Sequence, residues 1–125
     1  MSNDYLAQIV VRLTYNGAVN LRETVENPCD LAPDNVHGRC RMYTGPGKYT
    51  SLAARAVERH LCALGLAEMA WDGSYWHDAR QEHQRNMRCQ ITPLGREVAA
   101  YVASHWDELS TALLDSRKRG GRAND

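Results

Sequence analysis

The sequence predicts a mainly α domain with one small antiparallel pair of strands and a long C-terminal helix. Apolar residues recur at steps of three and four in three separate stretches, as they do in helices that bury one face. Two short runs, 66–71 and 87–92, have the composition of strands. The 125 residues suit a single domain, and 43% hydrophobic and 24% charged residues are typical of a globular fold.

The N-terminal part contains one clear helix and one weaker one. Apolar side chains at helical spacing predict a helix over 4–15, and Asn16 with Gly17 is typical of a helix end. Repeated Pro and Gly residues interrupt 18–49, which leaves 19–26 as the segment there that best favours a short helix.

The central segment predicts a helix followed by the pair of strands. The helix runs over 51–64, and Gly65 stands just after its end, where glycine is common. The polar segment 72–86 separates the strands at 66–71 and 87–92, and we expect it to form a long, flexible tip.

The C-terminal helix begins at about residue 93. Thr92 is a typical N-cap, and Pro93 suits the first helical position because its missing N–H has no partner there anyway. Apolar residues repeat through Leu114, which gives a helix about 30 Å long at 1.5 Å per residue. The segment 116–125 is polar and basic, and we expect a disordered tail there.

Charge is balanced overall but not along the chain. The 15 basic residues equal the 15 acidic ones, and all the basic residues except Lys48 and Lys118 are Arg. Residues 37–96 carry nine basic and five acidic side chains. A basic centre rich in Arg favours an anionic partner, because guanidinium groups hold phosphates through two parallel hydrogen bonds.

The sequence favours a cytoplasmic protein that does not enter a membrane. No charged-then-apolar leader opens the chain, so the four cysteines are expected to be reduced thiols. The longest apolar run, 98–103, is far shorter than the roughly 18 residues of a membrane-spanning helix.

No residue pattern predicts a metal, a cofactor or catalysis. Cys29, His37 and Cys40 are spaced too loosely for a structural zinc site, which uses close pairs of ligands. The Gly-Pro-Gly-Lys at 45–48 lacks the first glycine and the Ser or Thr of a phosphate-binding loop. Histidines and carboxylates are scattered without a nucleophile and a base in one motif, so we expect no enzyme activity.

Two short sequence motifs resemble those of a known family. LCALGL at 61–66 ends the central helix, and ITPLGR at 91–96 follows the second strand. In this order and about 25 residues apart, the two motifs resemble the winged helix-turn-helix domain of MarR- and PadR-type transcription regulators. The resemblance covers about 51–103, and the Asp-Ala-Arg at 78–80 is similar to an Asp-x-Arg found in MarR wings.

The resemblance implies a winged-helix domain over 1–115 that is mainly α with a small β-wing. It implies a recognition helix at about 51–64, a wing at about 66–92 and a dimerisation helix at about 93–114. The sequence departs from the family at 27–47, where a passage rich in Pro and Gly replaces the expected helix and short turn.

The resemblance further implies a regulator that binds double-stranded DNA as a homodimer. Its helix would enter the major groove, and its wing would reach the phosphates. The residues implied for DNA contact are Lys48, Tyr49, Thr50, Ser51, Arg55, Arg59, Arg80, Arg85 and Arg88. The residues implied for the dimer contact are Tyr101, Trp106, Leu109 and Leu113, which are equally suited to the core of one chain.

Several of these residues have a second interpretation. Arg55 and Arg59 would also suit a solvated helix face that pairs with Glu58 or Glu68. Tyr75 and Trp76 would form either a lid on the core or an exposed contact patch.

The thiol of Cys89 and the function as a whole also have alternatives. Cys89 suits a small buried hydrophobic residue, with a redox-sensing thiol as the alternative. The alternative function is a winged-helix protein-interaction module, such as a small phage- or plasmid-type inhibitor of a nucleic-acid-processing protein.

Overall fold

The computed structural model describes residues 2–26, 40–45, 48–52 and 55–120. These residues form five helices and four strands, so the expected mainly helical fold with a small antiparallel strand pair is confirmed, within a larger sheet. The elements are α1 (Asn3–Val10), α2 (Tyr15–Glu26), β1 (Cys40–Gly45), β2 (Lys48–Leu52), α3 (Arg55–Ala63), β3 (Ala67–His77), β4 (Glu82–Ile91), α4 (Pro93–Ser104) and α5 (Trp106–Gly120).

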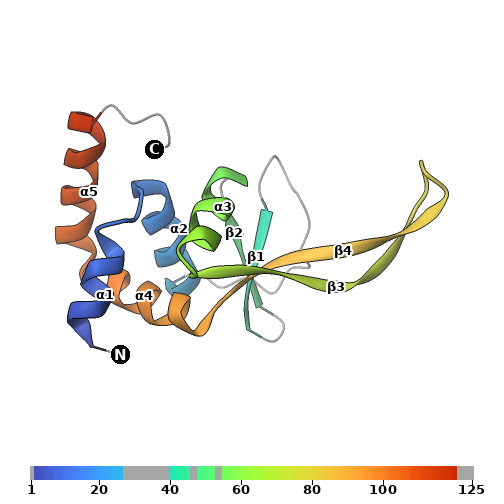
Figure 1. The fold of residues 1–125 in the computed structure, drawn as a ribbon, viewed down its shortest axis with the longest axis horizontal. Coiled ribbons are helices and arrows are strands. Elements are labelled where there is room, and N and C mark those ends of the chain that lie inside the picture. Colours follow the sequence, from blue (N-terminus) through green and yellow to red (C-terminus); the bar gives the residue numbers. More distant parts are fainter. Residues whose placement is uncertain (1, 27–39, 46–47, 53–54, 121–125) are drawn as a thin grey trace.

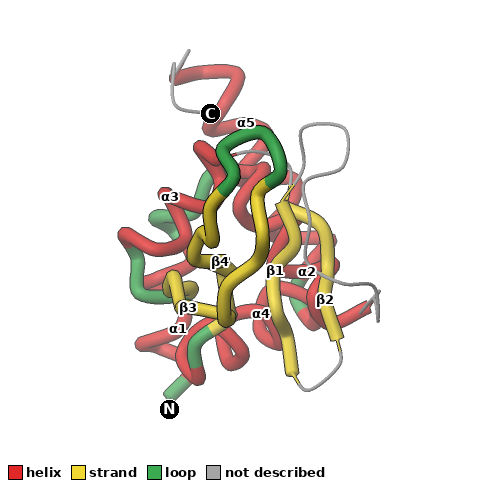
Figure 2. The backbone as a smooth tube through the Cα atoms, turned by 90° about the vertical axis from the view of Figure 1, so that its right-hand side faces the viewer, coloured by secondary structure: helices red, strands yellow, loops and turns green. Residues whose placement is uncertain are grey.

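The four strands form one sheet in the order β2-β1-β4-β3 (Figure 2). Two antiparallel hairpins, β1–β2 and β3–β4, meet where β1 runs parallel to β4. The parallel contact is short: Met42 pairs with Cys89, and Tyr43 pairs with Gln90. Figure 1 shows the far half of the β3–β4 hairpin projecting away from the helices, while its base stays among them.

The hydrophobic core lies between the helices and the base of the sheet. Met42 of β1 is 0% exposed and Cys89 of β4 is 2% exposed, so both strands of the parallel contact reach the core. Each helix from α1 to α4 contributes buried side chains, and the largest fully buried ones are Val10, Leu21, Leu61, Val98 and Val102.

The helix predicted over 4–15 is divided in the structure. The first helix, α1, ends at Val10, and α2 begins at Tyr15 and continues through the expected stop at Asn16 and Gly17. The side chain of Thr14 accepts a 3.0 Å hydrogen bond from the N–H of Gly17. This bond satisfies a free N–H in the first turn of α2, as an N-cap does, so Gly17 lies at the start of a helix and not at the end of one.

The central helix is shorter than predicted. It was expected from residue 51, but α3 begins at Arg55, and Thr50 and Ser51 lie in β2. Pairing with β1 gives the backbone of 48–52 the hydrogen bonds that a first helical turn would otherwise have supplied.

The two wing strands lie where they were predicted, but they are longer. Pairing of β3 with β4 runs from Ala67 opposite Ile91 to His77 opposite Glu82, with one irregularity between Trp71 and Ser74. Most of the expected tip over 72–86 is therefore paired strand, and the connecting turn is confined to residues 78–81.

The single C-terminal helix predicted over 93–114 is two helices. At His105 the backbone leaves helical geometry, with φ −119° and ψ 25°, and α5 starts at the next residue. The ring of His105 and the hydroxyl of Ser104 both lie within hydrogen-bond distance of the carbonyl oxygen of Tyr101, at 2.9 and 3.1 Å. Side chains that bond to the backbone in this way compete with the helical pattern.

The tail expected to be disordered from residue 116 is helical as far as Gly120. Arg117 and Lys118 lie in the last turns of α5. Basic side chains there favour the helix, because its C-terminal end carries partial negative charge. Within the described part of the chain, no helix is both long and apolar enough to cross a membrane.

Candidate nucleic-acid interface

The outer face of α3 presents two arginines. Val57 and Leu61 are buried beneath the helix, whereas Arg55 and Arg59 are exposed. Residues four apart lie on the same side of a helix, so both guanidinium groups belong to one surface. Among the residues that the structure describes, neither group makes an ion pair or a hydrogen bond, and the alternative pairing with Glu58 or Glu68 is not formed.

The C-terminal half of α3 is held against the turn between the N-terminal helices through His60. The backbone N–H of Thr14 donates a 3.2 Å hydrogen bond to Nε2 of His60, which joins the α1–α2 turn to α3. This contact was not predicted from the sequence. The two residues are 46 positions apart, and no motif connects them.

The end of α3 is held against the base of the hairpin. Gly65 has a φ of +76°, and the N–H groups of Gly65 and Leu66 donate to the carbonyls of Cys62 and Leu61 at 3.0 and 2.9 Å. This pair of bonds is a Schellman motif, which closes a helix with glycine in the left-handed conformation.

Thr92 completes the connection from the other side. Its hydroxyl donates to the carbonyl of Gly65 at 2.7 Å and accepts from the N–H of Gly95 at 2.9 Å. Its own N–H donates to the carbonyl of Leu66 at 3.1 Å. The predicted N-cap of α4 therefore also fixes α3 to the point where β4 ends.

The turn of the β3–β4 hairpin is ordered and carries an exposed arginine. The N–H and the side-chain amide of Gln81 both donate to the carbonyl of Asp78, at 3.3 and 2.8 Å, and Gln81 has a φ of 54°. Arg80 lies in this turn and is exposed. Arg85 and Arg88 lie further along β4, opposite Ser74 and Ala70.

Trp76 is part of an exposed aromatic pair close to this turn. Its side chain is 49% exposed, and its ring meets that of His83 edge to face, with centroids 5.2 Å apart. Trp76 is therefore exposed and does not fold back as a lid on the core. The side chain of Tyr75 lies outside the described part of the structure.

The four residues expected at the N-terminus of the recognition helix occupy β2. Lys48, Tyr49, Thr50 and Ser51 pair with the residues of β1 from Gly45 back to Arg41. They are therefore not at the start of α3, and the free N–H groups of a helix end do not accompany their side chains. Strand β2 contacts α3, so the four residues belong to an element that neighbours this helix.

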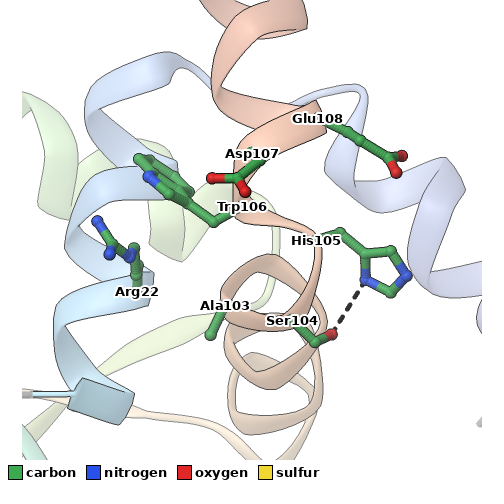
Figure 3. Close-up of a pocket in the computed structure, with 7 residues that line it drawn as sticks. All are labelled: Arg22, Ala103, Ser104, His105, Trp106, Asp107 and Glu108. Carbon is green, nitrogen blue, oxygen red and sulfur yellow. Dashed lines mark hydrogen bonds between the residues drawn. The ribbon is translucent and has the colours of Figure 1, made fainter.

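The residues expected to form the dimer contact lie around the α4–α5 junction. Tyr101, Trp106, Leu109 and Leu113 are half-buried and pack against the core. A hollow of about 320 Å³ lies beside this junction. Arg22 of α2 and residues 103–108 line it (Figure 3). The guanidinium of Arg22 lies 4.8 Å from the centre of the Trp106 ring, which is a cation–π contact, while His105 points away from Arg22.

The metal-ligating residue types do not gather into a site in the part of the chain that the structure describes. No group of three or more His, Cys, Asp or Glu side chains there is arranged to hold a metal ion. Of the loosely spaced trio considered above, Cys29 and His37 lie outside the described residues, and only the backbone of Cys40 is described.

Comparison with known proteins gives no relative. No family model, no curated protein and no solved structure matches this chain. The candidate interface is therefore identified from the geometry of this chain alone.

Proposed function

We propose that the protein is a cytoplasmic transcription regulator that binds double-stranded DNA through α3 and the β3–β4 hairpin, in the manner of a winged helix. One observation carries the proposal. Helix α3, which carries the exposed Arg55 and Arg59, contacts the base of a hairpin that extends beyond the helices and has an exposed arginine in its turn (Figure 1).

The dimensions of the two elements suit a DNA duplex. The nine residues of α3 form a rod about 13 Å long at 1.5 Å per residue, comparable with the major groove width of about 12 Å. The eleven residues of β3 extend about 35 Å at about 3.3 Å per residue. A helix in the major groove would thus leave the hairpin long enough to reach the neighbouring phosphates.

The local charge also favours an anionic partner. Residues 40–66 contain four basic side chains and only one acidic side chain, Glu58. This segment includes β1, β2 and α3, which lie side by side in the structure. The balanced charge of the whole chain therefore does not hold for this segment.

The arrangement differs from an ordinary helix-turn-helix. The described helix that precedes α3 in the chain is α2, and the β1–β2 hairpin lies between them. In this protein α3 would be positioned by α2, through the Thr14–His60 bond, and by the Schellman motif at its end. We therefore propose a winged helix whose recognition helix is supported by a sheet.

The test is fluorescence-anisotropy binding to random-sequence duplex DNA at 50 and 200 mM salt, roughly the range over which phosphate contacts lose most of their affinity. The variants are Arg55→Ala/Arg59→Ala on α3 and Arg80→Ala/Arg85→Ala on the hairpin. The control is Arg12→Ala/Arg96→Ala, which removes the same charge from two exposed positions outside both elements.

We expect the DNA affinity of the wild-type protein to fall as salt rises. Each test pair should lower this affinity about tenfold or more, whereas the control pair should leave it unchanged. Each lost phosphate contact should also reduce the salt dependence of binding. Equal losses in all three pairs would indicate a general charge effect and would contradict the proposed interface. Absence of binding at low salt would exclude DNA as the partner.

We further propose that the protein forms a homodimer through α5. Asp107 and Glu108 stand in its first turn, and Arg117 and Lys118 stand near its end. Two copies of α5 that run antiparallel would place the acidic end of each helix beside the basic end of the other. The half-buried Leu109 and Leu113 lie between these ends, and they would supply the apolar centre of a two-fold interface.

Light scattering after size exclusion tests the dimer. The wild-type protein should have twice the mass of one chain, and Leu113→Glu should return it to one chain. Arg117→Glu/Lys118→Glu should also weaken the dimer, and adding Asp107→Lys/Glu108→Lys should restore it. A wild-type protein of single-chain mass at micromolar concentration would contradict this part of the proposal.

The second candidate is the protein-interaction module, and Trp76 favours it. Tryptophan is among the residues that most often dominate protein–protein binding energy, and here it is half exposed at the end of an ordered hairpin. The two candidates differ in their response to salt. Binding through Trp76 would change little with salt and would be lost in Trp76→Ala, whereas DNA binding would fall steeply with salt.

A further inference from the structure

The end of the β3–β4 hairpin carries an aromatic surface that the proposed contact with duplex DNA does not use. Trp76 of β3 is 49% exposed. Its ring meets that of His83, the residue opposite it in β4, with centroids 5.2 Å apart and an interplanar angle of 74°. An edge-to-face contact covers at most one face of the indole, so the rest of the ring is open to solvent.

The hairpin presents this ring in a defined position. The backbone N–H and the side-chain amide of Gln81 donate to the carbonyl of Asp78 at 3.3 and 2.8 Å, directly after the last pair of the ladder. The hairpin carries Trp76 away from the helices (Figure 1). A side chain that is already held in place loses less conformational entropy when it binds a partner.

The charges around Trp76 favour an anionic partner. Residues two apart on a strand share a face, so Arg85 belongs to the same face of the hairpin as His83 and Trp76. Glu68 and Glu82, the carboxylates at paired positions of the ladder, belong to the opposite face. The turn itself contains one acidic and one basic residue, so it does not reverse this balance.

The size of the surface suits one flat ring. Half of an aromatic side chain is about 100 Å², whereas a stable protein interface covers about 800 Å² on each partner. A nucleic-acid base is a ring of matching size, and bases of every kind stack on aromatic side chains. Bases inside a duplex are already stacked on their neighbours, so an unpaired base is the kind that can cover Trp76.

We propose that Trp76 is a stacking site for an unpaired DNA base, so that the protein binds duplex DNA where it adjoins a single strand. This inference rests on the proposed binding of duplex DNA through α3. Trp76 lies nine positions along β3 from Ala67, which is about 30 Å at about 3.3 Å per residue, or about nine base pairs at 3.4 Å each. The stacked base therefore lies outside the groove that α3 would occupy, and the two contacts do not compete.

The experiment measures fluorescence-anisotropy binding of the full chain to two DNAs at low salt. Both have the same duplex of about 20 base pairs, roughly twice the reach of the hairpin, and a single-stranded tail of about six nucleotides. The tail contains thymidines in one DNA and abasic sites in the other, so the phosphate charge is equal and only the bases differ. The variants are Trp76→Leu, Trp76→Phe and Arg55→Ala/Arg59→Ala. The control is Tyr5→Leu, which removes a ring of 46% exposure from α1.

The wild-type protein should bind the thymidine tail about fivefold or more tightly than the abasic tail, the lower end of the range for stacking on one base. Trp76→Leu should abolish this preference. Trp76→Phe should keep most of it because phenylalanine also stacks, and Tyr5→Leu should keep all of it. Arg55→Ala/Arg59→Ala should weaken binding to both DNAs by the same factor. Circular dichroism verifies that each variant is folded.

Three outcomes would overturn the inference. Equal affinity of the wild-type protein for the two tails would leave Trp76 to the protein-interaction candidate, while duplex binding would stand if Arg55→Ala/Arg59→Ala still weakened it. A preference for thymidine that survives in Trp76→Leu would place the stacking elsewhere. Absence of binding to both DNAs would overturn the inference together with the proposed function.

Discussion

The N–H of Thr14 and the imidazole of His60 are joined by a hydrogen bond of 3.2 Å, in which Nε2 of the ring is the acceptor. Gly17 lies on the same ring: a Cβ placed on Gly17 would be 2.9 Å from Cδ2 of His60. The α1–α2 turn and the first turn of α2 thus both meet α3 through one side chain. The position of the arginine face therefore depends on His60.

Replacing Gly17 and His60 should give effects that are not additive. His60→Ala leaves the partly buried N–H of Thr14 without this acceptor and should reduce the free energy of unfolding by about 1–3 kcal/mol. Gly17→Ala crowds the ring and should also destabilise the protein, by about 1–3 kcal/mol. In the double variant the ring is absent, so the Gly17→Ala effect should be smaller. Urea unfolding of all four proteins measures the coupling, and additivity within about 0.5 kcal/mol would contradict the contact.

The glycine of α4 should not tolerate alanine. A Cβ on Gly95 would overlap the carbonyl oxygen of Leu66 and stand 2.7 Å from Cγ1 of Ile91. Helix propensity alone would favour Gly95→Ala by about 1 kcal/mol, but the backbone overlap should outweigh this and destabilise the protein by more than about 2 kcal/mol.

Gly65→Ala is the matched comparison, because a Cβ there meets nothing within 4 Å and only the positive φ opposes it. It should destabilise the protein by about 1–2 kcal/mol, and Gly65→Asn by less. Thermal unfolding that ranks Gly65→Ala as the more damaging change would contradict the close contact at Gly95.

Cys62 should make the stability of the protein depend on alkaline pH. Burial raises its pKa above the ordinary value of 9.0, so the folded state keeps its proton to higher pH than the unfolded state does. The stabilisation is complete below the unfolded pKa and is lost as pH rises through the folded pKa. Between the two pKa values, the free energy of unfolding should fall by up to about 1.4 kcal/mol per pH unit.

Urea unfolding from pH 7 to 10 in the presence of a reductant checks this. The matched control is Cys62→Ser, which should lack this part of the alkaline loss because serine does not ionise there. Parallel curves for the two proteins would show that Cys62 does not contribute.

The two described tryptophan side chains should differ in their contribution to stability. Trp106 packs on Arg22 and lies 6.1 Å from the ring of Tyr15, so Trp106→Ala should destabilise the protein by about 2 kcal/mol or more. Trp76 is half exposed and contacts His83, so Trp76→Ala should change the free energy of unfolding by less than about 1 kcal/mol. Denaturant unfolding followed by circular dichroism measures both, and a larger effect at Trp76 would contradict its position outside the core.

The elements that the sequence predicted well are those with strong local signals. Thr92 and Pro93 mark the start of α4, and Gly65 marks the end of α3, because capping involves residues close in the chain. The central strand segments at 67–71 and 87–91 are also confirmed.

The errors occur where a distant partner or a competing local bond decides the structure. The helix predicted over 51–64 was expected to begin at Ser51, but Ser51 and Leu52 pair with β1 as part of a strand. The residues at 74–77 lie in a segment without apolar alternation, yet they pair with β4 through their backbone. The break at His105 comes from side chains that approach the carbonyl of Tyr101, while the apolar spacing continues past it.

The candidate site was predicted in part for the same reason. Arg55 and Arg59 are exposed on one helix face, as the helical spacing required. The contacts that position this face were not predicted, because the Thr14–His60 bond and the Thr92–Gly65 bond join residues far apart in the chain.

The short parallel contact between β1 and β4 has a consequence for the order of folding. Each hairpin closes a short loop, whereas the pairing of Met42 with Cys89 closes a loop of 47 positions, from 42 to 89, and restricts more of the unfolded chain. The two hairpins should therefore form as separate local units and join late. In the native protein, the β1–β4 contact consists of only two residue pairs, so losing these pairs separates the two hairpins. Amide hydrogens of β1 should therefore exchange with solvent through a local opening that leaves the β3–β4 pairing intact.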